Sequence, residues 1–367
     1  MAGGDVLVVG TGLIGTSIGL AATAAGRRVW LSDTDGERIR LAASLGAGRP
    51  LPDPAGISAA PEVSLVVVAV PPAAIAAACI EALAAHPHAT VTHVGSVQSQ
   101  PALEVEAQTD TSRFVGSHPI AGREVSGPAA ADPALFVDRP WAICAVAGSG
   151  QDAVDEVGRL VADCRARAVF LDPGEHDRLL ARLSHAPQLV ASALAAALVD
   201  LDPQAVALAG TGLRDTTRVA DSDPSMWGQI AQANADALAV ALRAVAEPLV
   251  ALAESLERRP EAGGEAATGL VGRGRLGRAL LPGKHGRRPA SYATVHCAVP
   301  DEPGALARLF TDIAAQRVNV EDFRVEHAPG QPVGVIEIAV SPADRARLLE
   351  GLHQRGWTAT PGADEAL

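Results

Sequence analysis

The sequence predicts an α/β protein in three parts: a parallel-sheet domain, an all-helical domain and a small α+β module. In the first 170 residues, short β-like runs such as Val6–Val9 and Leu65–Val70 alternate with Ala-rich helical ones, which is typical of a parallel sheet. Strand-like runs largely disappear between residues 172 and 259, where long Ala/Leu segments predict helices. The tail at 291–361 reads strand, helix, strand, strand, helix, strand, which is the order of a ferredoxin-like module.

Apolar runs and the breaks between them locate the individual elements. Expected strands of the first part are Val6–Val9, Val29–Ser32, Leu65–Val70, Thr90–Val94 and Trp141–Val146, with helices at Ile14–Ala25, Gly36–Leu45 and Pro72–Ala85. The helical part is expected at His176–Leu201 and Trp227–Leu256. The tail is expected to contain Tyr292–Val299, Gly304–Gln316, Val320–His327, Val333–Val340, Pro342–Arg355 and Trp357–Thr360.

These elements divide the chain into domains at 1–171, 172–259 and 291–361, with a linker at 260–290. The linker is predicted because Gly, Arg and Pro dominate this segment and few apolar positions recur periodically. The helical domain has more apolar surface than one short bundle can bury, which favours helices shared between the subunits of a homodimer.

Composition and charge exclude several kinds of partner. The net charge of −12 argues against nucleic-acid binding, which needs a basic surface, and no run is long and apolar enough to predict a membrane span. Four widely spaced cysteines without a CxxC pattern indicate a reduced, cytoplasmic protein. His86, His88 and His93 fit no standard metal spacing, and we predict no metal site.

A glycine-rich turn follows the first strand and predicts a dinucleotide site. The run Gly10-Thr11-Gly12-Leu13-Ile14-Gly15 has the GxGxxG spacing and opens a helix, whose free N–H groups can bind a pyrophosphate. Asp33 ends the second strand about twenty residues later, where a carboxylate can accept hydrogen bonds from the adenine ribose. The first domain is therefore predicted to be a Rossmann-type domain that prefers NAD to NADP.

Three further segments carry polar residues that a hydrophobic core would not contain. Gly95-Ser96-Val97 follows the fourth strand and so lies at the carboxyl edge of the sheet, where ligands bind. The segment 116–127 reads GSHPIAGREVSG, and the segment 214–227 reads RDTTRVADSDPSMW. These segments are the candidates for the chemistry of the protein.

In motif type and order the chain resembles the prephenate/arogenate dehydrogenase family. The family pairs a GSHPxxGxExxG-like segment with a later Ser-His pair, here Ser184-His185, and with an RDTTRxAxSDPxMW-like segment; the resemblance covers residues 5–258. It implies oxidative decarboxylation of prephenate with NAD⁺ to 4-hydroxyphenylpyruvate, CO₂ and NADH in tyrosine biosynthesis. The alternative is an arogenate dehydrogenase that gives tyrosine directly. The tail resembles an ACT domain at Asp301–Leu306, which implies an aromatic amino acid, tyrosine first, as effector.

The resemblance also implies roles for individual residues. His118 is expected to be the base that accepts a hydrogen bond from the substrate hydroxyl, since a histidine titrates near neutrality. Ser96 is expected beside the hydroxyl and the nicotinamide, where it could orient His118. Arg218 is expected to bind a substrate carboxylate through its planar, permanently charged guanidinium.

A second set of residues is expected to shape and gate the pocket. His185 and Glu124 match a pair that does so in the family, and Trp227 matches an aromatic residue that reaches a neighbouring subunit's site. His176-Asp177 is expected to be a pair in the cap region of the long helix. The family often has other residues at three positions, which are His93, Gln98 and Gln188 here, and this leaves the choice between prephenate and arogenate open.

Two other kinds of protein remain as hypotheses. A non-catalytic sensor of NAD and an amino acid could use the same scaffold, although it would not need His118 beside the nicotinamide. A β-hydroxyacid-type dehydrogenase would need a lysine base in the helical domain, and residues 172–259 contain no lysine. Both hypotheses predict NAD binding without turnover of prephenate.

Overall fold

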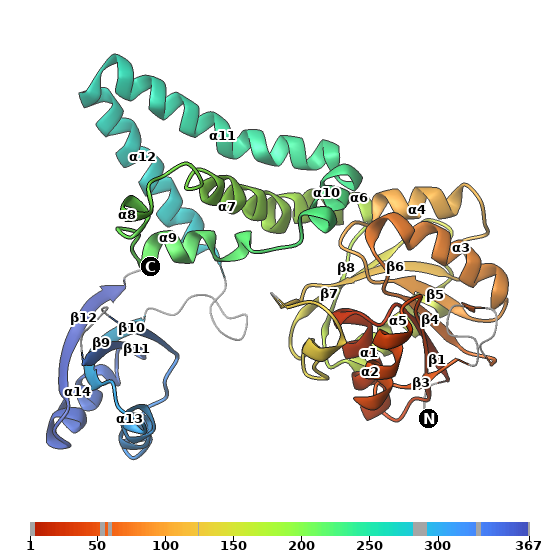
Figure 1. Cartoon of the computed structure of the whole chain (residues 1–367), viewed down its shortest axis with the longest axis horizontal. Helices are drawn as coiled ribbons and strands as arrows, with labels where there is room; N and C mark the ends of the chain where they lie inside the picture. The colour runs from red at the N-terminus through yellow and green to blue at the C-terminus, as the bar shows by residue number, and fades with distance from the viewer. Residues whose placement is uncertain are drawn as a thin grey trace. The chain divides into compact units, whose positions relative to one another are not determined.

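The chain folds into two compact units, Met1–Leu249 and Val250–Leu367. The structure is a computed structural model that describes residues 4–51, 56–57, 61–123, 125–281, 292–327 and 332–365. Figure 1 follows the chain from the sheet domain through the helices to the C-terminal module. In the described ranges, we find no helix with the length and apolar character needed to cross a membrane.

An eight-stranded sheet organises the first unit, in the order β3-β2-β1-β4-β5-β6-β7-β8. All neighbouring strands are parallel except β6 and β7, which are antiparallel. The strands are β1 (Val6–Val9), β2 (Val29–Ser32), β3 (Arg49–Pro50), β4 (Leu65–Val68), β5 (Thr90–His93), β6 (Phe114–Pro119), β7 (Pro140–Ala145) and β8 (Arg167–Phe170). The predicted Rossmann-type domain is confirmed, and the sequence missed β3, β6 and β8.

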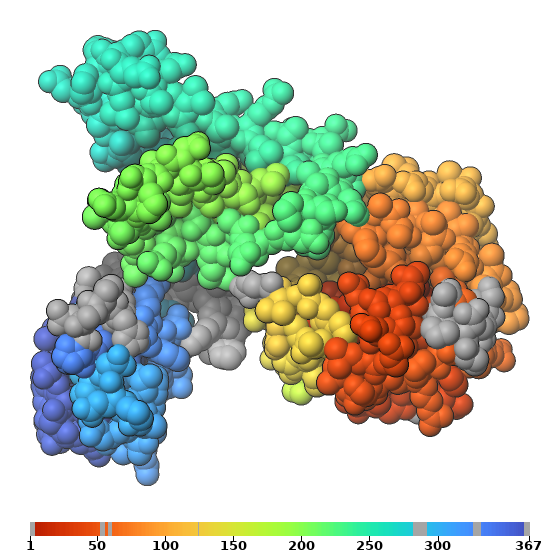
Figure 2. Space-filling view, viewed as in Figure 1, coloured from red at the N-terminus to blue at the C-terminus, as the bar shows by residue number. Residues whose placement is uncertain are grey.

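Helices cover both faces of this sheet, which explains why β1 and β4 are apolar at every position. The helices are α1 (Leu13–Ala24), α2 (Gly36–Ser44), α3 (Ile75–Ala85), α4 (Ser99–Glu106) and α5 (Gln151–Asp163). In β1, Val6 and Val8 face one core with α1 and α5, whereas Leu7 and Val9 face a second core with α3 and α4. This part forms a closely packed body in the space-filling view, coloured red to yellow (Figure 2).

Residues 172–281, all within the described ranges, contain helices and no strands, as predicted for the helical domain. These helices are shorter than the sequence suggested. The segment expected as His176–Leu201 divides into α6 (Pro173–Leu180), a π-helical turn (Ala181–His185) and α7 (Ala186–Ala196). The segment expected as Trp227–Leu256 divides at Asn234 into α10 (Pro224–Ala233) and α11 (Ala235–Arg258). The short helices α8 (Pro203–Val206) and α9 (Thr211–Thr217) lie between α7 and α10.

The predicted linker is wrong for most of its length, because Pro260–Ala279 forms the helix α12. Pro260 occupies the first turn, where a missing N–H costs nothing, and alanines favour the helix that follows. Gly263 faces Leu256, whose Cδ2 would lie 2.6 Å from an added Cβ, so one of the glycines serves close packing. Residues 282–290 of the predicted linker lie outside the described residues.

The C-terminal module has a four-stranded antiparallel sheet in the order β10-β11-β9-β12. Its elements are β9 (Tyr292–Pro300), α13 (Ala305–Ala314), β10 (Asp322–His327), β11 (Val333–Val340), α14 (Arg345–Gln354) and β12 (Thr358–Glu365). Alternate residues of β9, including Val295, Cys297 and Val299, pack in one core with Leu309 of α13 and Leu348 of α14. The predicted strand–helix–strand–strand–helix–strand order is confirmed.

Candidate active site

The glycine-rich turn between β1 and α1 has the geometry that a dinucleotide needs. Gly10 has φ +96, and an added Cβ would lie 2.4 Å from the Ala69 carbonyl oxygen, so only glycine fits there. At Gly15 an added Cβ would lie 1.9 Å from the Gly10 carbonyl oxygen, which shows how closely helix and strand approach. Gly12 faces open space and caps α1 without a side-chain hydrogen bond, which leaves room and N–H groups for a pyrophosphate.

Asp33 lies beside this turn at the end of β2. Its Oδ2 accepts hydrogen bonds from the backbone N and the Oγ1 of Thr11, at 2.6 and 2.8 Å, and its Oδ1 accepts one from the Asp35 N–H. These bonds direct the carboxylate toward the glycine-rich turn, at the sheet edge where the adenine ribose of a dinucleotide binds. The residues of this edge therefore fit NAD.

His118 lies near the end of β6, half-buried, and a second histidine contacts it. Its Nδ1 is hydrogen-bonded to Nε2 of His176 at 3.0 Å. Burial lowers the pKa of His118 well below its ordinary value, the charges of His176, His185 and His93 lower it further, and Asp177 raises it. The ring is therefore neutral at neutral pH, as a proton acceptor must be.

His176 and Asp177 lie in α6 and are buried, with exposed fractions of 0% and 4%. Nδ1 of His176 is 2.8 Å from Oδ1 of Asp177, and the same carboxylate accepts the backbone N–H groups of Gln98 and Ser99 at 2.9 and 2.8 Å. The pair was expected in the cap region of the helix, but Asp172 is the N-cap of α6. Instead, His176-Asp177 joins His118 to the start of α4, which sequence reasoning missed.

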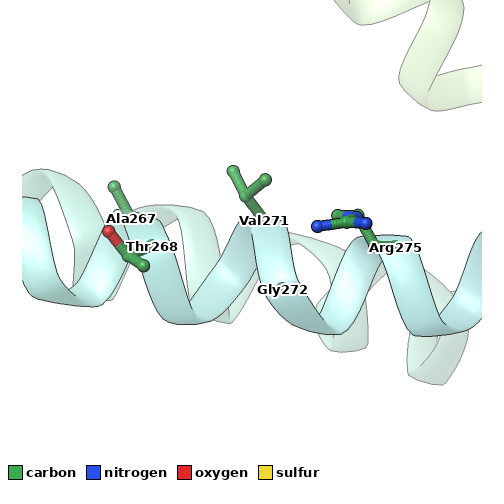
Figure 3. A pocket seen from close by; sticks show the side chains of 5 residues that line it. All are labelled: Ala267, Thr268, Val271, Gly272 and Arg275. Atoms are coloured by element: carbon green, nitrogen blue, oxygen red, sulfur yellow. The ribbon is translucent and has the colours of Figure 1, made fainter. Parts of the chain in front are cut away.

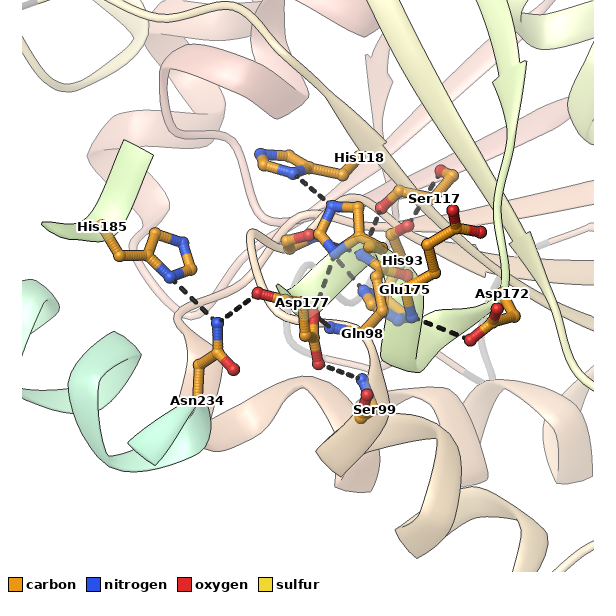
Figure 4. Close-up of polar contacts among 12 residues, drawn as sticks. His93, Gln98, Ser99, Ser117, His118, Asp172, Glu175, Asp177, His185 and Asn234 are labelled. Carbon is orange, nitrogen blue, oxygen red and sulfur yellow. Dashed lines mark hydrogen bonds and ion pairs between the residues drawn. The ribbon is translucent and has the colours of Figure 1, made fainter. Parts of the chain in front are cut away.

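His185 ends the π-helical turn and connects to the same cluster. Asn234 donates hydrogen bonds from Nδ2 to the backbone oxygen of Asp177 at 2.9 Å and to Nδ1 of His185 at 3.1 Å (Figure 4). These contacts also explain the break between α10 and α11 at Asn234. Since Nδ1 of His185 accepts, its Nε2 carries the proton; this Nε2 is buried and lacks a partner among the described residues.

Trp227 of α10 packs on His185, with ring centroids 6.0 Å apart and planes at 77°. Its Nε1 is also buried without a hydrogen-bond partner in the described parts of the chain. Burial lowers the pKa of His185 to about 4 against the opposing effect of Asp177, so its ring is neutral. Two unsatisfied N–H donors in adjoining rings are unusual in a folded protein and mark a place where an acceptor of a ligand can bind.

Arg218 begins a 3₁₀ turn, Arg218–Ala220, and is exposed. Gln188 of α7 donates a hydrogen bond to the Val219 carbonyl and so fixes the turn. Ser96 is half-buried in the turn after β5, and among the described residues the side-chain hydrogen bond of His118 is made with His176, not with Ser96. Glu124 lies outside the described residues.

His93 and Gln98, two of the three positions where the family often has other residues, are buried next to the Gly95–Val97 turn. The Gly95 N–H donates to Nδ1 of His93 at 3.2 Å, and Nε2 of Gln98 donates to the carbonyls of Gly95 and Ser117 at 2.7 and 3.0 Å. Burial lowers the pKa of His93 to about 3, so this ring is neutral. Hydrogen bonds of both residues to the Gly95 backbone therefore hold the turn that carries Ser96.

The described surface includes two shallow hollows. One, of about 420 Å³, is lined by residues that follow β6 in the chain and include Ile120, Arg123, Asp132 and Arg139. The other, of about 440 Å³, is lined by residues along the single helix α12: Ala267, Thr268, Val271, Gly272 and Arg275 (Figure 3). None of the predicted site residues borders the hollow on α12.

The Rossmann-type sheet, the glycine-rich turn with Asp33 and a neutral histidine at the same sheet edge define an NAD-dependent oxidoreductase. Comparison with known proteins narrows this class. The family model for the prephenate dehydrogenase nucleotide-binding domain matches residues 18–170, and the model for the prephenate dehydrogenase dimerization domain matches residues 172–263. The chain belongs to the prephenate dehydrogenase family.

Curated relatives match nearly the full length of the chain, and a solved structure matches three quarters of it. A probable prephenate dehydrogenase of Streptomyces niveus is 33% identical over 362 residues, covering 96% of this chain and 98% of the relative. The prephenate dehydrogenase of Bacillus subtilis is 29% identical, with 98% of each chain covered. The crystal structure of Aquifex aeolicus prephenate dehydrogenase with hydroxyphenyl propionate and NAD⁺ has a TM-score of 0.68 at 26% identity, covering 75% of this chain and 96% of that one.

Proposed function

We propose that the protein is an NAD-dependent prephenate dehydrogenase. Prephenate carries a hydroxyl and a hydrogen on C4 of a cyclohexadiene ring, together with a ring carboxylate. Loss of the hydroxyl proton and the C4 hydride gives a ring ketone, and loss of CO₂ then makes the ring aromatic. Its oxygen takes a proton back to give 4-hydroxyphenylpyruvate. The observation that carries the proposal is the neutral, half-buried His118 at the sheet edge that also bears the glycine-rich turn.

Different residues at this edge of the sheet would bind the cofactor, accept the proton and orient the substrate. Bound NAD⁺ supplies the hydride acceptor. The turn at Gly10–Gly15 would hold its pyrophosphate, through Thr11, Gly12, Leu13 and Ile14 of the same run, and Asp33 would hold its ribose. His118 takes the hydroxyl proton, and the electron pair of that O–H bond forms the carbonyl as the hydride departs. Ser96 would orient the hydroxyl from the neighbouring turn.

Cationic and donor groups would anchor the acidic substrate. Arg218 has the planar fork that suits a carboxylate. The unsatisfied Nε2–H of His185 and Nε1–H of Trp227 lie in adjoining rings and could donate to the substrate's oxygens. Glu124 is proposed to act with His185 in shaping the pocket.

Formation of NADH with prephenate, and separately with arogenate, tests the activity. We expect turnover of prephenate, followed as the rise of nicotinamide absorbance and the release of CO₂. Turnover of arogenate alone would make the protein an arogenate dehydrogenase. NAD binding with turnover of neither substrate would contradict the proposal and favour a sensor.

A homodimer joined through the helical domain is proposed as the assembly. Apolar side chains of this domain are exposed in the single chain, with Leu208 at 87%, Val199 at 80% and Val240 at 70%. Surfaces of this kind mark interfaces with another chain. Val240→Arg should raise the monomer fraction in analytical ultracentrifugation, whereas Leu103→Arg on the equally exposed α4 should leave the dimer intact; equal effects would contradict this interface.

The C-terminal module is proposed to be an ACT domain that binds an aromatic amino acid, with tyrosine as the first candidate. Support comes from the turn before α13, where Gly304 has φ +88 and caps the helix without a side-chain bond. Backbone N–H groups of α13 are thereby available to a carboxylate. Titration of tyrosine, phenylalanine and tryptophan against activity tests this, and no effect from any of them would leave the module without an effector role.

A further inference from the structure

The carboxylate of Asp177 determines where the proton of His176 lies. Burial raises the pKa of Asp177, but hydrogen bonds from His176, Ser99 and Gln98 outweigh burial and hold this pKa below its ordinary value. The group is therefore a carboxylate, which can only accept hydrogen bonds. Nδ1 of His176, at 2.8 Å, must be the donor.

The same reasoning extends one ring further. A neutral imidazole carries one proton, so a His176 that donates from Nδ1 has an acceptor at Nε2. Nε2 of His176 lies 3.0 Å from Nδ1 of His118, which must then carry the proton of that ring. Nε2 of His118 is left with a free lone pair, and it forms no hydrogen bond to any residue that the structure describes.

We propose that His176 and Asp177 are positioning residues that hold His118 in the tautomer whose Nε2 accepts the substrate's hydroxyl proton. This inference rests on the proposed function, and it gives a role at the site to two residues that the sequence analysis expected only in the cap region of a helix. When the O–H bond breaks, its proton moves to Nε2 of His118 and its electron pair stays with the substrate oxygen. The imidazolium that forms keeps its Nδ1–H bond to His176, and the Asp177 charge stabilises it.

Other charged and titratable groups near His118 do not provide this function. His93 and His185 face the cluster and act on His118 only through charge, since no hydrogen bond joins either ring to it among the described residues. Asp177 carries the carboxylate bonded to His176, and the backbone N–H groups of Gln98 and Ser99, at the start of α4, fix its position. The fixed carboxylate of Asp177, acting through the buried ring of His176, favours the His118 tautomer with its proton on Nδ1. This preference requires no uptake of a proton.

Nuclear magnetic resonance of histidine side chains labelled with ¹⁵N tests the tautomers without any substrate. At about pH 8 we expect His118 and His176 of the full chain to carry their protons on Nδ1. His118→Asn and His176→Phe assign the signals. A proton on Nε2 of His118 would overturn the proposal.

Paired substitutions at His176 test the consequence for catalysis. His176→Phe removes the acceptor, and kcat should fall by about 10²-fold with the KM for prephenate and the Kd for NAD⁺ within about threefold. His176→Gln offers an amide oxygen to Nδ1 of His118 and should recover at least about tenfold of the lost kcat. His86→Phe removes another buried histidine, hydrogen-bonded to the Ile57 carbonyl in the same domain, and should retain the wild-type kcat.

The outcomes separate this proposal from the proposed function. Equal kcat values for the Phe and Gln variants, or a fall confined to KM, would overturn the positioning role. A chain that binds NAD⁺, has both histidines protonated on Nδ1 and oxidises neither prephenate nor arogenate would instead overturn the proposed function. In that case the hydrogen bonds that link Asp177, His176 and His118 would be confirmed, but the proposed reaction would be rejected.

Discussion

Gln188 donates a hydrogen bond from Nε2 to the backbone carbonyl of Val219 at 2.6 Å, and so fixes the turn that begins with Arg218. Gln188→Leu removes this bond and should loosen the proposed carboxylate anchor. We expect the KM for prephenate to rise about 2- to 10-fold, the effect of one hydrogen bond, with little change in kcat. Gln204→Leu, an exposed position on α8, is the control. A KM equal to that of the wild type would contradict the role of the turn.

His118→Asn should abolish most of the activity without removing the cofactor. Asparagine keeps a polar group near the His176 contact but cannot accept a proton, so we expect kcat to fall by about 10²- to 10⁴-fold. Isothermal titration of NAD⁺ should give a Kd close to the wild-type value, because the glycine-rich turn is unchanged. His88→Asn alters an exposed histidine as a control. A wild-type rate for His118→Asn would exclude His118 as the base.

The pH profile of kcat/KM should report the depressed pKa of His118. The base must be unprotonated, and burial together with the charges of His176, His185 and His93 lowers its pKa. Activity should therefore stay on its plateau through neutral pH and decline only in acid, below the usual histidine range near about 6.5. The measurement uses saturating NAD⁺ and prephenate well below KM. A decline centred at or above the usual histidine range would contradict this environment for His118.

Asp33→Ser should weaken the preference for NAD over NADP. The carboxylate is held by Thr11 toward the glycine-rich turn, where its charge repels a ribose phosphate. Its removal should lower the ratio of kcat/KM values for NAD⁺ and NADP⁺ by roughly tenfold or more. Asp35→Asn keeps an oxygen at the N-cap of α2 and serves as the matched control. An unchanged ratio would show that Asp33 does not select the cofactor.

Sequence patterns predicted those parts of the fold that are determined by residues close together in the chain. The turn at Gly10–Gly15 and the apolar strand Val6–Val9 define the nucleotide domain because backbone conformation and burial act over a few residues. His118 was named from the family resemblance, and it lies near the end of β6, a strand that the sequence did not predict. The order of elements in the C-terminal module was predicted from period and length in the same way.

Contacts between distant residues were beyond such reasoning. Asn234 interrupts an apolar helical pattern because it bonds to Asp177 and His185, 57 and 49 residues away. His176 is adjacent to the N-terminal region of a helix, which suggests a cap, yet its partner His118 is 58 residues away. The segment after Pro260 was predicted as a linker because glycine lowers helix propensity, but alanines and packing against Leu256 compensate.

The π-helical turn between α6 and α7 sets the angle around the helix axis between Asp177 and His185 in the candidate site. A residue advances an α-helix by about 100°, so a regular helix would set His185 about 80° around the axis from Asp177. The π-helical turn Ala181–His185 takes up one additional residue and brings them to within about 20° of each other, which lets Asn234 contact both. A regular α-helix over the same residues would keep every polar side chain but would turn His185 away from Asn234. The π-helical turn between the His-Asp and Ser-His pairs is therefore as much a part of this site as the residues themselves.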